Sequence, residues 1–129
     1  MDVTVNFEIA KLVEEKGFQP KGPIAEYWEV DSRQFLINTW EDEYDTLHHE
    51  DSPDDMIFLC SAPTIAEVVM WLYEKHGIWI GVQRDWDVGQ CLGFEGIIDG
   101  NDGIINTKTL NSPTEAYEAA IKHALENII

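Results

Sequence analysis

The chain has 129 residues, 44% of them hydrophobic and 11% aromatic, and its 25 acidic residues against 8 lysines and arginines give a net charge of −17. Because nucleic acids and anionic lipids are bound through lysine and arginine, this charge excludes direct binding to DNA, RNA or a membrane surface. The length suits one domain with its own core, and the apolar content excludes a wholly disordered chain. The sequence also contains no run of about 20 apolar residues, the length of a transmembrane helix.

The N-terminal residues and the two cysteines indicate the cellular compartment. Residues 1–16 mix Asp2, Glu8 and Lys11 with apolar residues, which is unlike a secretory signal peptide, so we expect a cytoplasmic protein. Thiols stay reduced in the cytoplasm. We therefore interpret Cys60 and Cys91 as small buried apolar residues rather than as a disulfide.

The first third of the chain predicts a helix followed by a hairpin. Apolar residues recur at helical spacing over residues 5–16, and Gly17 is placed to end that helix. Ala25–Val30 and residues 33–40 are rich in strand-forming residues, and Asp31-Ser32 between them suits a two-residue turn. We expect these two strands to pair.

Residues 41–55 form an acidic segment in which ten of fifteen residues are acidic or histidine. We interpret it as a solvated loop, because it offers few side chains that could anchor a core. Its imidazole and carboxylate groups also suit zinc, nickel or manganese, and the candidate ligands are Asp45, His48, His49 and Asp51. Neither the HxxxH nor the HExxH spacing occurs, so the sequence predicts no metal and no other cofactor.

The densest apolar stretch runs from residue 61 to residue 83 and follows an apolar segment at 56–60, which is either a short extended piece or packing beneath the next helix. Thr64 and Glu67 have the spacing of a capping box, and Gly77 is a stop signal, so a helix is predicted between them. Residues 78–83 then favour a strand. The helix residues expected in the core are Ile65, Val68, Val69 and Leu72.

The last part of the chain predicts a second hairpin and a final helix. Residues 84–89 indicate a turn, residues 91–98 the partner strand, and residues 99–103 a second tight turn. A short strand follows at 104–107. Ser112 and Pro113 then begin a helix whose apolar residues keep the i, i+3, i+4 pattern to residue 128.

Together these elements predict an α+β fold in the order αββαββα. The expected architecture is one antiparallel sheet of about four strands, with the helices mainly on one face, in a single domain that spans residues 1–129.

Three parts of the sequence resemble a known group of proteins: residues 10–18, residues 62–78 and residues 117–121. They resemble small uncharacterised (hypothetical) proteins of Bacteroidetes and their phages and prophages. These motifs are helix starts, helix stops and core faces, and the group has no assigned activity. The resemblance implies a phage or mobile-element setting, in which small acidic proteins often act by binding a host protein.

Catalytic patterns are weak in this sequence. No recognised motif ties a histidine to either cysteine or to a serine, and the glycines are not spaced as a phosphate-binding loop. Residues 99–103 superficially suggest a calcium loop, but Leu110 occupies the twelfth position, where a bidentate glutamate is required. We therefore predict that the protein is not an enzyme.

Exposed aromatic residues give the better functional signal. Trp71 and Met70 in the central helix, Trp79 in the following strand and Trp28 in the first hairpin all fall opposite expected core positions. A two-sided core is one explanation for them. The other is a protein interface, because tryptophan and tyrosine often anchor such contacts.

Three functions are consistent with these features. The leading hypothesis is a small acidic protein-binding module of phage or mobile-element origin, either monomeric or homodimeric, whose partner is a host protein, with a basic protein as one candidate. The first alternative is a small-ligand binder or hydrolase with a pocket between sheet and helices. The second is a DNA mimic that inhibits a basic host protein through its acidic surface.

Overall fold

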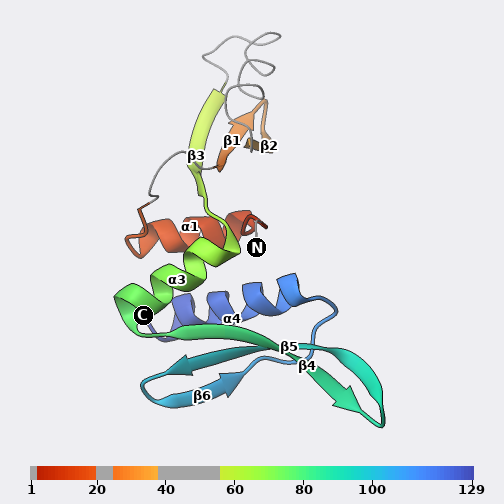
Figure 1. Cartoon of the computed structure of the whole chain (residues 1–129). Coiled ribbons are helices and arrows are strands. Elements are labelled where there is room, and N and C mark those ends of the chain that lie inside the picture. Colours follow the sequence, from red (N-terminus) through yellow and green to blue (C-terminus); the bar gives the residue numbers. More distant parts are fainter. Residues whose placement is uncertain (1–2, 20–24, 38–55) are drawn as a thin grey trace. The chain divides into compact units, whose positions relative to one another are not determined.

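The computed structural model describes residues 3–19, 25–37 and 56–129 and confirms the α+β class (Figure 1). The chain divides into two compact units. We call Met1–Val3 with Thr64–Ile129 unit 1, and Thr4–Pro63 unit 2. That both belong to a single domain stays a prediction.

Unit 2 begins with helix α1, Phe7–Glu15. The Asn6 side chain caps its first turn by accepting a hydrogen bond from the Ile9 amide at 2.9 Å. Gly17 lies in the left-handed region at φ +95°, which allows the amides of residues 17 and 18 to bond back to the last turn. The predicted helix stop is therefore confirmed.

Among the described residues of unit 2, three antiparallel strands form a sheet in the order β2-β1-β3. Strands β1, Ala25–Val30, and β2, Arg33–Ile37, form the predicted hairpin, and both turn residues, Asp31 and Ser32, have positive φ. Strand β3, Met56–Ala62, pairs with the other edge of β1. The apolar segment at 56–60 is thus a strand of this sheet, not packing beneath a helix.

Tyr27 contacts both α1 and the residues just before it. The Tyr27 hydroxyl donates a 2.7 Å hydrogen bond to the Val5 carbonyl, and the Tyr27 ring meets Phe7 edge to face with the ring centroids 5.3 Å apart. Cys60 is buried nearby. Desolvation and the Glu14 carboxylate raise the pKa of this thiol from 9.0 to about 11, so it stays neutral.

Both helices of unit 1 begin as the sequence predicts. In α3, Ile65–His76, the Thr64 hydroxyl accepts a hydrogen bond from the Glu67 amide, and the Glu67 carboxylate accepts one from the Thr64 amide. Gly77 ends the helix at φ +67°. In α4, Pro113–Asn127, Ser112 is the N-cap.

The sheet of unit 1 consists of β4, Trp79–Asp87, β5, Gln90–Gly100, and β6, Gly103–Asn106, in the order β4-β5-β6. Helix α4 contacts β4 and β5, and α3 contacts β4. Ile80 and Ile98, directly paired, are almost fully buried on the face that the helices cover (Figure 1). The arrangement of helices on one face is confirmed here.

Two details of the predicted sheet need correction. In the described residues, six strands form two three-stranded sheets instead of one sheet of about four, because each hairpin pairs with a third strand from its own half of the chain. The turn expected at 84–89 is only Val88-Gly89. The polar residues that suggested a long turn belong to the outer hairpin, where most side chains are exposed to water.

The β4–β5 hairpin contains one irregularity. Asp85 pairs with Gly93 and the next residue, Trp86, pairs with Cys91, so Leu92 is an extra residue in β5. Such a bulge increases the local twist of the strands. The outer end of the hairpin, beyond the bulge, accordingly bends away from the rest of the sheet (Figure 1).

Candidate functional site

Two exposed aromatic side chains lie against each other in unit 1. Tyr73, in the last turns of α3, and Trp79, the first residue of β4, pack edge to face with ring centroids 5.4 Å apart and an angle of 85° between the rings. Tyr73 is 53% exposed and Trp79 is 47% exposed. Gly77 makes the contact possible, because its left-handed backbone turns the chain from the helix directly into the strand.

Further exposed side chains extend this pair in two directions. Along α3, Met70 precedes Tyr73 by three residues, so the two lie on one helix face, and Met70 is exposed. Across the sheet, Trp79 lies opposite Asp99, which lies opposite Ile104. Residues directly opposite each other share a face, so these three side chains lie on the sheet face turned away from the core.

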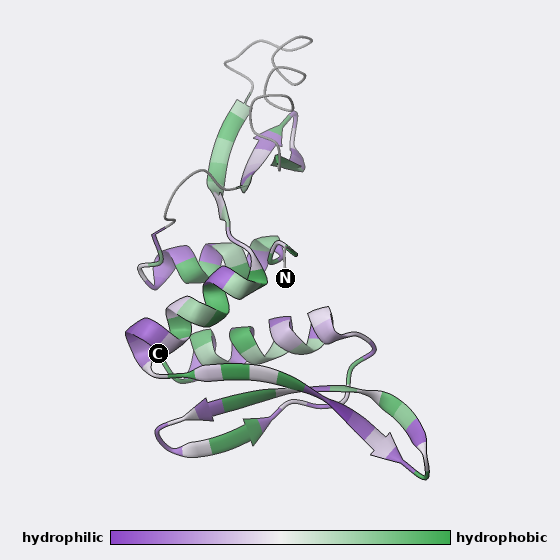
Figure 2. Cartoon of the chain, in the orientation of Figure 1, coloured by the Kyte–Doolittle hydropathy of each residue, from purple (hydrophilic) through white to green (hydrophobic). Residues whose placement is uncertain are grey.

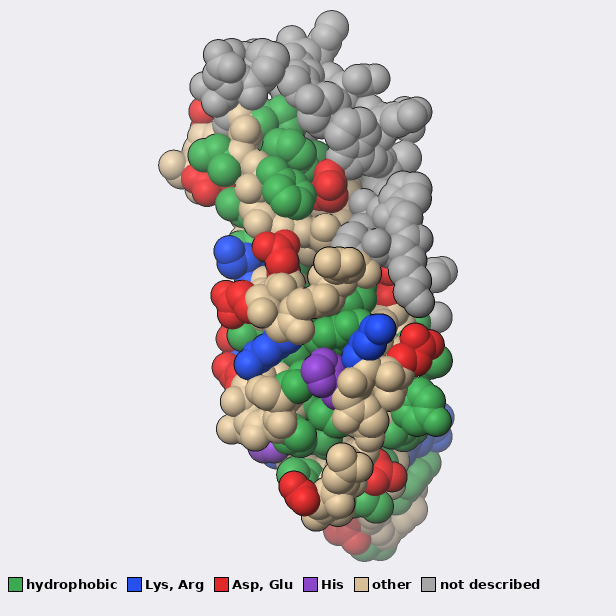
Figure 3. Space-filling model, turned by 90° about the vertical axis from the view of Figure 1, so that its left-hand side faces the viewer, with side chains coloured by type: hydrophobic (Ala, Val, Ile, Leu, Met, Phe, Trp, Pro, Cys, Tyr) green, Lys and Arg blue, Asp and Glu red, His purple; other side chains and the backbone are tan. Residues whose placement is uncertain are grey.

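We call Met70, Tyr73, Trp79 and Ile104, together with the Asp99 carboxylate, the Trp79 surface. Ile104 is 67% exposed. Figure 2 shows hydrophobic residues in all three strands of this sheet, although helices cover only one of its faces. Figure 3 shows exposed hydrophobic side chains among acidic ones on the side of unit 1 that faces the viewer.

The sequence-predicted interface residues do not form one cluster. Met70 and Trp79 belong to the Trp79 surface, whereas Trp71 is half-buried on the next face of α3 and its ring meets His76 at 4.9 Å. Trp28 lies in unit 2. Tyr73 was not predicted, although its spacing of three residues from Met70 is a signal that could have identified it.

Trp28 belongs to a row of aromatic residues across the unit 2 sheet. It lies opposite Phe35 on one side and Phe58 on the other, with the Trp28 and Phe58 ring centroids 5.5 Å apart. Its indole Nε1 donates to the Glu26 carboxylate at 3.2 Å. Phe58 and Phe35 are exposed at the two ends of this row, while Trp28 between them is half-buried.

The outer end of the β4–β5 hairpin is also apolar. Trp86, Val88 and Leu92 are exposed, and the Arg84 guanidinium lies 5.6 Å from the centre of the Trp86 ring. Cys91 is exposed here as a free thiol, so the prediction that both cysteines are buried is wrong for this one. It lies beyond the part of the sheet that the helices cover.

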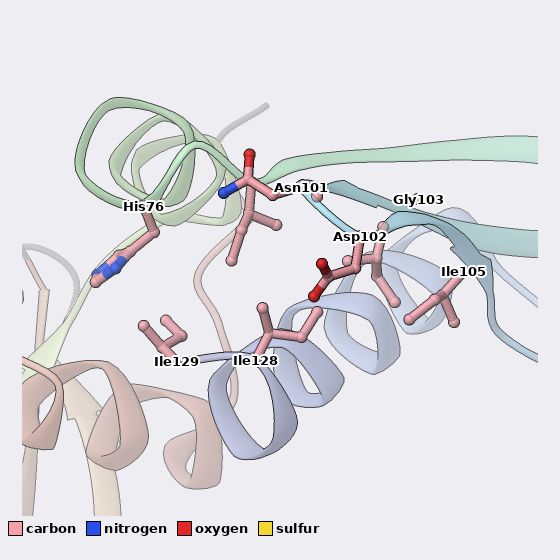
Figure 4. Close-up of a pocket in the computed structure, with 10 residues that line it drawn as sticks. His76, Asn101, Asp102, Gly103, Ile105, Ile128 and Ile129 are labelled. Atoms are coloured by element: carbon pink, nitrogen blue, oxygen red, sulfur yellow. The ribbon is translucent and has the colours of Figure 1, made fainter.

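A pocket of about 270 Å³ lies between the end of α4 and the β5–β6 turn (Figure 4). It is slightly smaller than the roughly 300–1,000 Å³ of typical small-ligand sites. His76 and Asp102 are its ionisable groups, but they lie at opposite sides with Ile128 and Ile129 between them (Figure 4). The polar groups therefore do not converge as an acid–base pair would.

The metal prediction falls on residues that the structure does not describe. Asp45, His48, His49 and Asp51 all lie outside the described residues, as does the rest of the segment 41–55. Within residues 3–19, 25–37 and 56–129, no group of three or more histidine, cysteine or acidic side chains could hold a metal ion. In the same part of the chain, no helix is long and apolar enough to cross a bilayer.

The exposed aromatic pair, the hairpin end and the pocket are therefore the features from which a function can be argued. Of these, the Trp79 surface has two exposed aromatic rings packed against each other, with a carboxylate directly opposite the tryptophan. The chain matches no protein-family model, no curated protein and no solved structure.

Proposed function

We propose that this protein is a non-enzymatic binding module that acts by contact with another protein through the Trp79 surface. The observation that carries the proposal is the exposure of Tyr73, Trp79 and Ile104, at 53%, 47% and 67%, in one part of unit 1. Contiguous exposed apolar side chains of this size mark interaction sites, and tyrosine and tryptophan are the commonest anchors.

The rigidity of the two aromatic side chains supports the same proposal. Tyr73 and Trp79 are held by their mutual packing, and Trp79 is fixed further by its place at the start of a paired strand. A partner that buries them therefore orders few additional rotamers, which lowers the entropy cost of binding. A large apolar area presented rigidly is the property that an interface anchor requires.

An enzyme finds less support in the described residues. The pocket at the end of α4 lacks converging polar groups, and Cys60 is buried with a pKa raised to about 11, so little of it is thiolate at neutral pH. The DNA-mimic alternative depends largely on the acidic segment 41–55 and stays a prediction.

The resemblance to Bacteroidetes and phage proteins supports a phage or mobile-element setting for this function. In that setting the partner is a protein of the bacterial host, and the binding takes place in the cytoplasm. The whole-chain charge of −17 would speed the encounter with a positively charged partner.

A pull-down with matched variants tests the proposal. Tagged wild type, Trp79→Ala and Trp86→Ala are incubated with Bacteroidetes lysate at low salt, and the captured proteins are compared by mass spectrometry. Both tryptophans lie in β4 and are about half exposed, so the Trp86 variant controls for loss of an exposed indole. We expect a protein that wild type and Trp86→Ala capture and that Trp79→Ala loses.

Identical captured proteins for all three forms would contradict the proposal. Circular dichroism of each variant verifies that the fold is retained, so that a loss of capture is not due to unfolding.

A further inference from the structure

We propose that the Trp79 surface takes a basic segment of its partner, with a lysine or arginine side chain seated on the exposed face of the Trp79–Tyr73 ring pair beside the Asp99 carboxylate. This inference rests on the proposed function and specifies the chemistry of the partner. It is carried by the geometry of the two rings, the position of the carboxylate and the charge around them.

The two rings form a corner suited to a cation. Their planes meet at 85° with the centroids 5.4 Å apart, so the edge of one ring rests against the face of the other, and a cation placed in the angle beside this contact lies near both side chains. Ring faces carry partial negative charge and attract ammonium and guanidinium groups within about 6 Å of the centroid. Tryptophan is the strongest of the aromatic residues in this respect.

Asp99 supplies a formal negative charge next to this corner. It is paired directly with Trp79 across β4 and β5, which places the two Cβ atoms about 4.5–5.5 Å apart on one face. Among the described residues, no hydrogen-bond donor or cation contacts the Asp99 carboxylate, whereas the Glu95 carboxylate on the same strand accepts bonds from Gln83 and Asn106. Asp99 therefore remains available for a charge from outside.

The chain itself shows the contact that we propose for the partner. On the same strand, the Arg84 guanidinium covers the Trp86 ring at 5.6 Å. No described lysine or arginine makes the equivalent contact with Trp79. The partner's cation would lie over the Trp79 ring as the Arg84 guanidinium lies over the Trp86 ring.

Charge argues for a basic partner and against a second copy of the chain. Residues 79–106, which span the three strands, contain five carboxylates and one arginine, and the whole chain carries −17. Two copies of this acidic surface repel each other. A basic segment is attracted to it, and the charges favour the orientation in which the basic groups of the segment face the carboxylates. Met70 and Ile104 flank the corner, so the segment should combine its cation with aliphatic side chains.

A synthetic peptide tests the inference directly. The probe is a fluorescein-labelled peptide that repeats lysine, leucine and serine, compared with the same peptide carrying norleucine in place of lysine. Anisotropy titrations are made at ionic strengths of about 0.01 M and 0.15 M, between which the Debye length falls from about 30 Å to about 8 Å. We expect the lysine peptide to bind, its affinity to fall with salt, and the norleucine peptide to bind much more weakly.

Two double variants with the same change in composition and charge locate the contact. Trp79→Leu with Asp99→Asn removes the indole and the carboxylate of the proposed site, and we expect about tenfold weaker binding of the lysine peptide, as expected for losing one cation–π contact and one surface ion pair. Trp86→Leu with Asp87→Asn makes the same changes on the outer hairpin, and we expect binding within twofold of wild type. Melting temperatures verify that both double variants fold.

Three results would overturn the inference. Equal weakening by both double variants would mean that the peptide senses only the overall negative charge. Equally tight binding of the norleucine peptide would mean that the surface recognises apolar groups. A wild-type dimer in sedimentation analysis that the Trp79→Leu, Asp99→Asn variant abolishes would make a second copy the occupant.

The peptide and lysate experiments can fail separately. If Trp79→Ala loses a captured protein but the lysine peptide does not bind, protein binding stands and the basic partner is wrong. If Trp79 affects neither experiment, both proposals fall.

Discussion

Gly96 marks the closest approach of helix α4 to strand β5, and a methyl group added there has no room. In Gly96→Ala the new Cβ would lie 2.8 Å from the Ala120 Cβ and 3.1 Å from the Thr107 Cγ2, and it would also press on the Ala116 carbonyl oxygen. Carbon atoms pack best at about 3.5–4.0 Å, so α4 would have to move off the sheet by nearly 1 Å. Overpacking of this kind costs about 1–3 kcal/mol, and we expect the upper half of that range because backbone and Cβ atoms cannot rotate away.

Urea unfolding followed by tryptophan fluorescence measures the effect. The matched control is Gly81→Ala in the neighbouring strand β4, where a Cβ would meet nothing within 4 Å. That variant should keep the wild-type stability or gain about 0.4–1 kcal/mol, because alanine restricts the unfolded chain. A loss of less than about 0.5 kcal/mol in Gly96→Ala would refute the close packing of α4 on β5.

Four further predictions concern stability and thiol chemistry. Leu72→Ala, at a fully buried position of α3, should lower the free energy of unfolding by about 2–5 kcal/mol in the same urea assay. A loss below about 1 kcal/mol would show that this face of the helix is not part of the core. Val88→Asn should raise the free energy of unfolding by up to about 1–2 kcal/mol, because valine is strained at φ +49° in a two-residue turn where asparagine is favoured. An unchanged urea midpoint would argue against this strain. In native protein near pH 8, iodoacetamide should label the exposed Cys91 and leave Cys60 unmodified, which peptide mass mapping measures. Labelling of both cysteines at equal rates would contradict the burial of Cys60. Because the pKa of Cys60 is 9.0 when unfolded and about 11 when folded, its contribution to stability should fall as pH rises from 9 to 11, which unfolding curves of wild type and Cys60→Ser would detect.

The helix ends could be predicted because they depend on single side chains. Thr64 and Glu67 satisfy each other's amides wherever the helix lies in the fold, and glycines such as Gly77 can adopt a left-handed backbone without strain. Such signals need no information about distant residues. They gave correct starts for α3 and α4 and correct stops for α1 and α3.

Strand lengths and sheet partners could not be predicted in the same way. The alternation of polar and apolar residues identifies a strand only where one face is buried, and the outer half of the β4–β5 hairpin is exposed on both faces. The pairing of β3 with β1 joins residues far apart in the sequence. Nothing in the local pattern of either strand specifies that partner.

The candidate site was predictable only in part for a similar reason. Alternation with Ile78 and Ile80 indicated that Trp79 points away from the core, and the structure places it there. Its contact with Tyr73 depends on the direction in which the chain leaves Gly77. The angle between helix and strand is a tertiary property that spacing does not encode.

The bulge at Leu92 also has a consequence for protein engineering. Continuous pairing of β4 with β5 runs from Trp79 to Asp85 and is interrupted there, before the outer end of the hairpin begins. The inner part is additionally fixed in register by the tight packing of α4 on Gly96. Residues inserted at Val88-Gly89 would therefore lengthen or reshape only the outer hairpin, which makes this turn a suitable position for grafting a foreign peptide onto the protein.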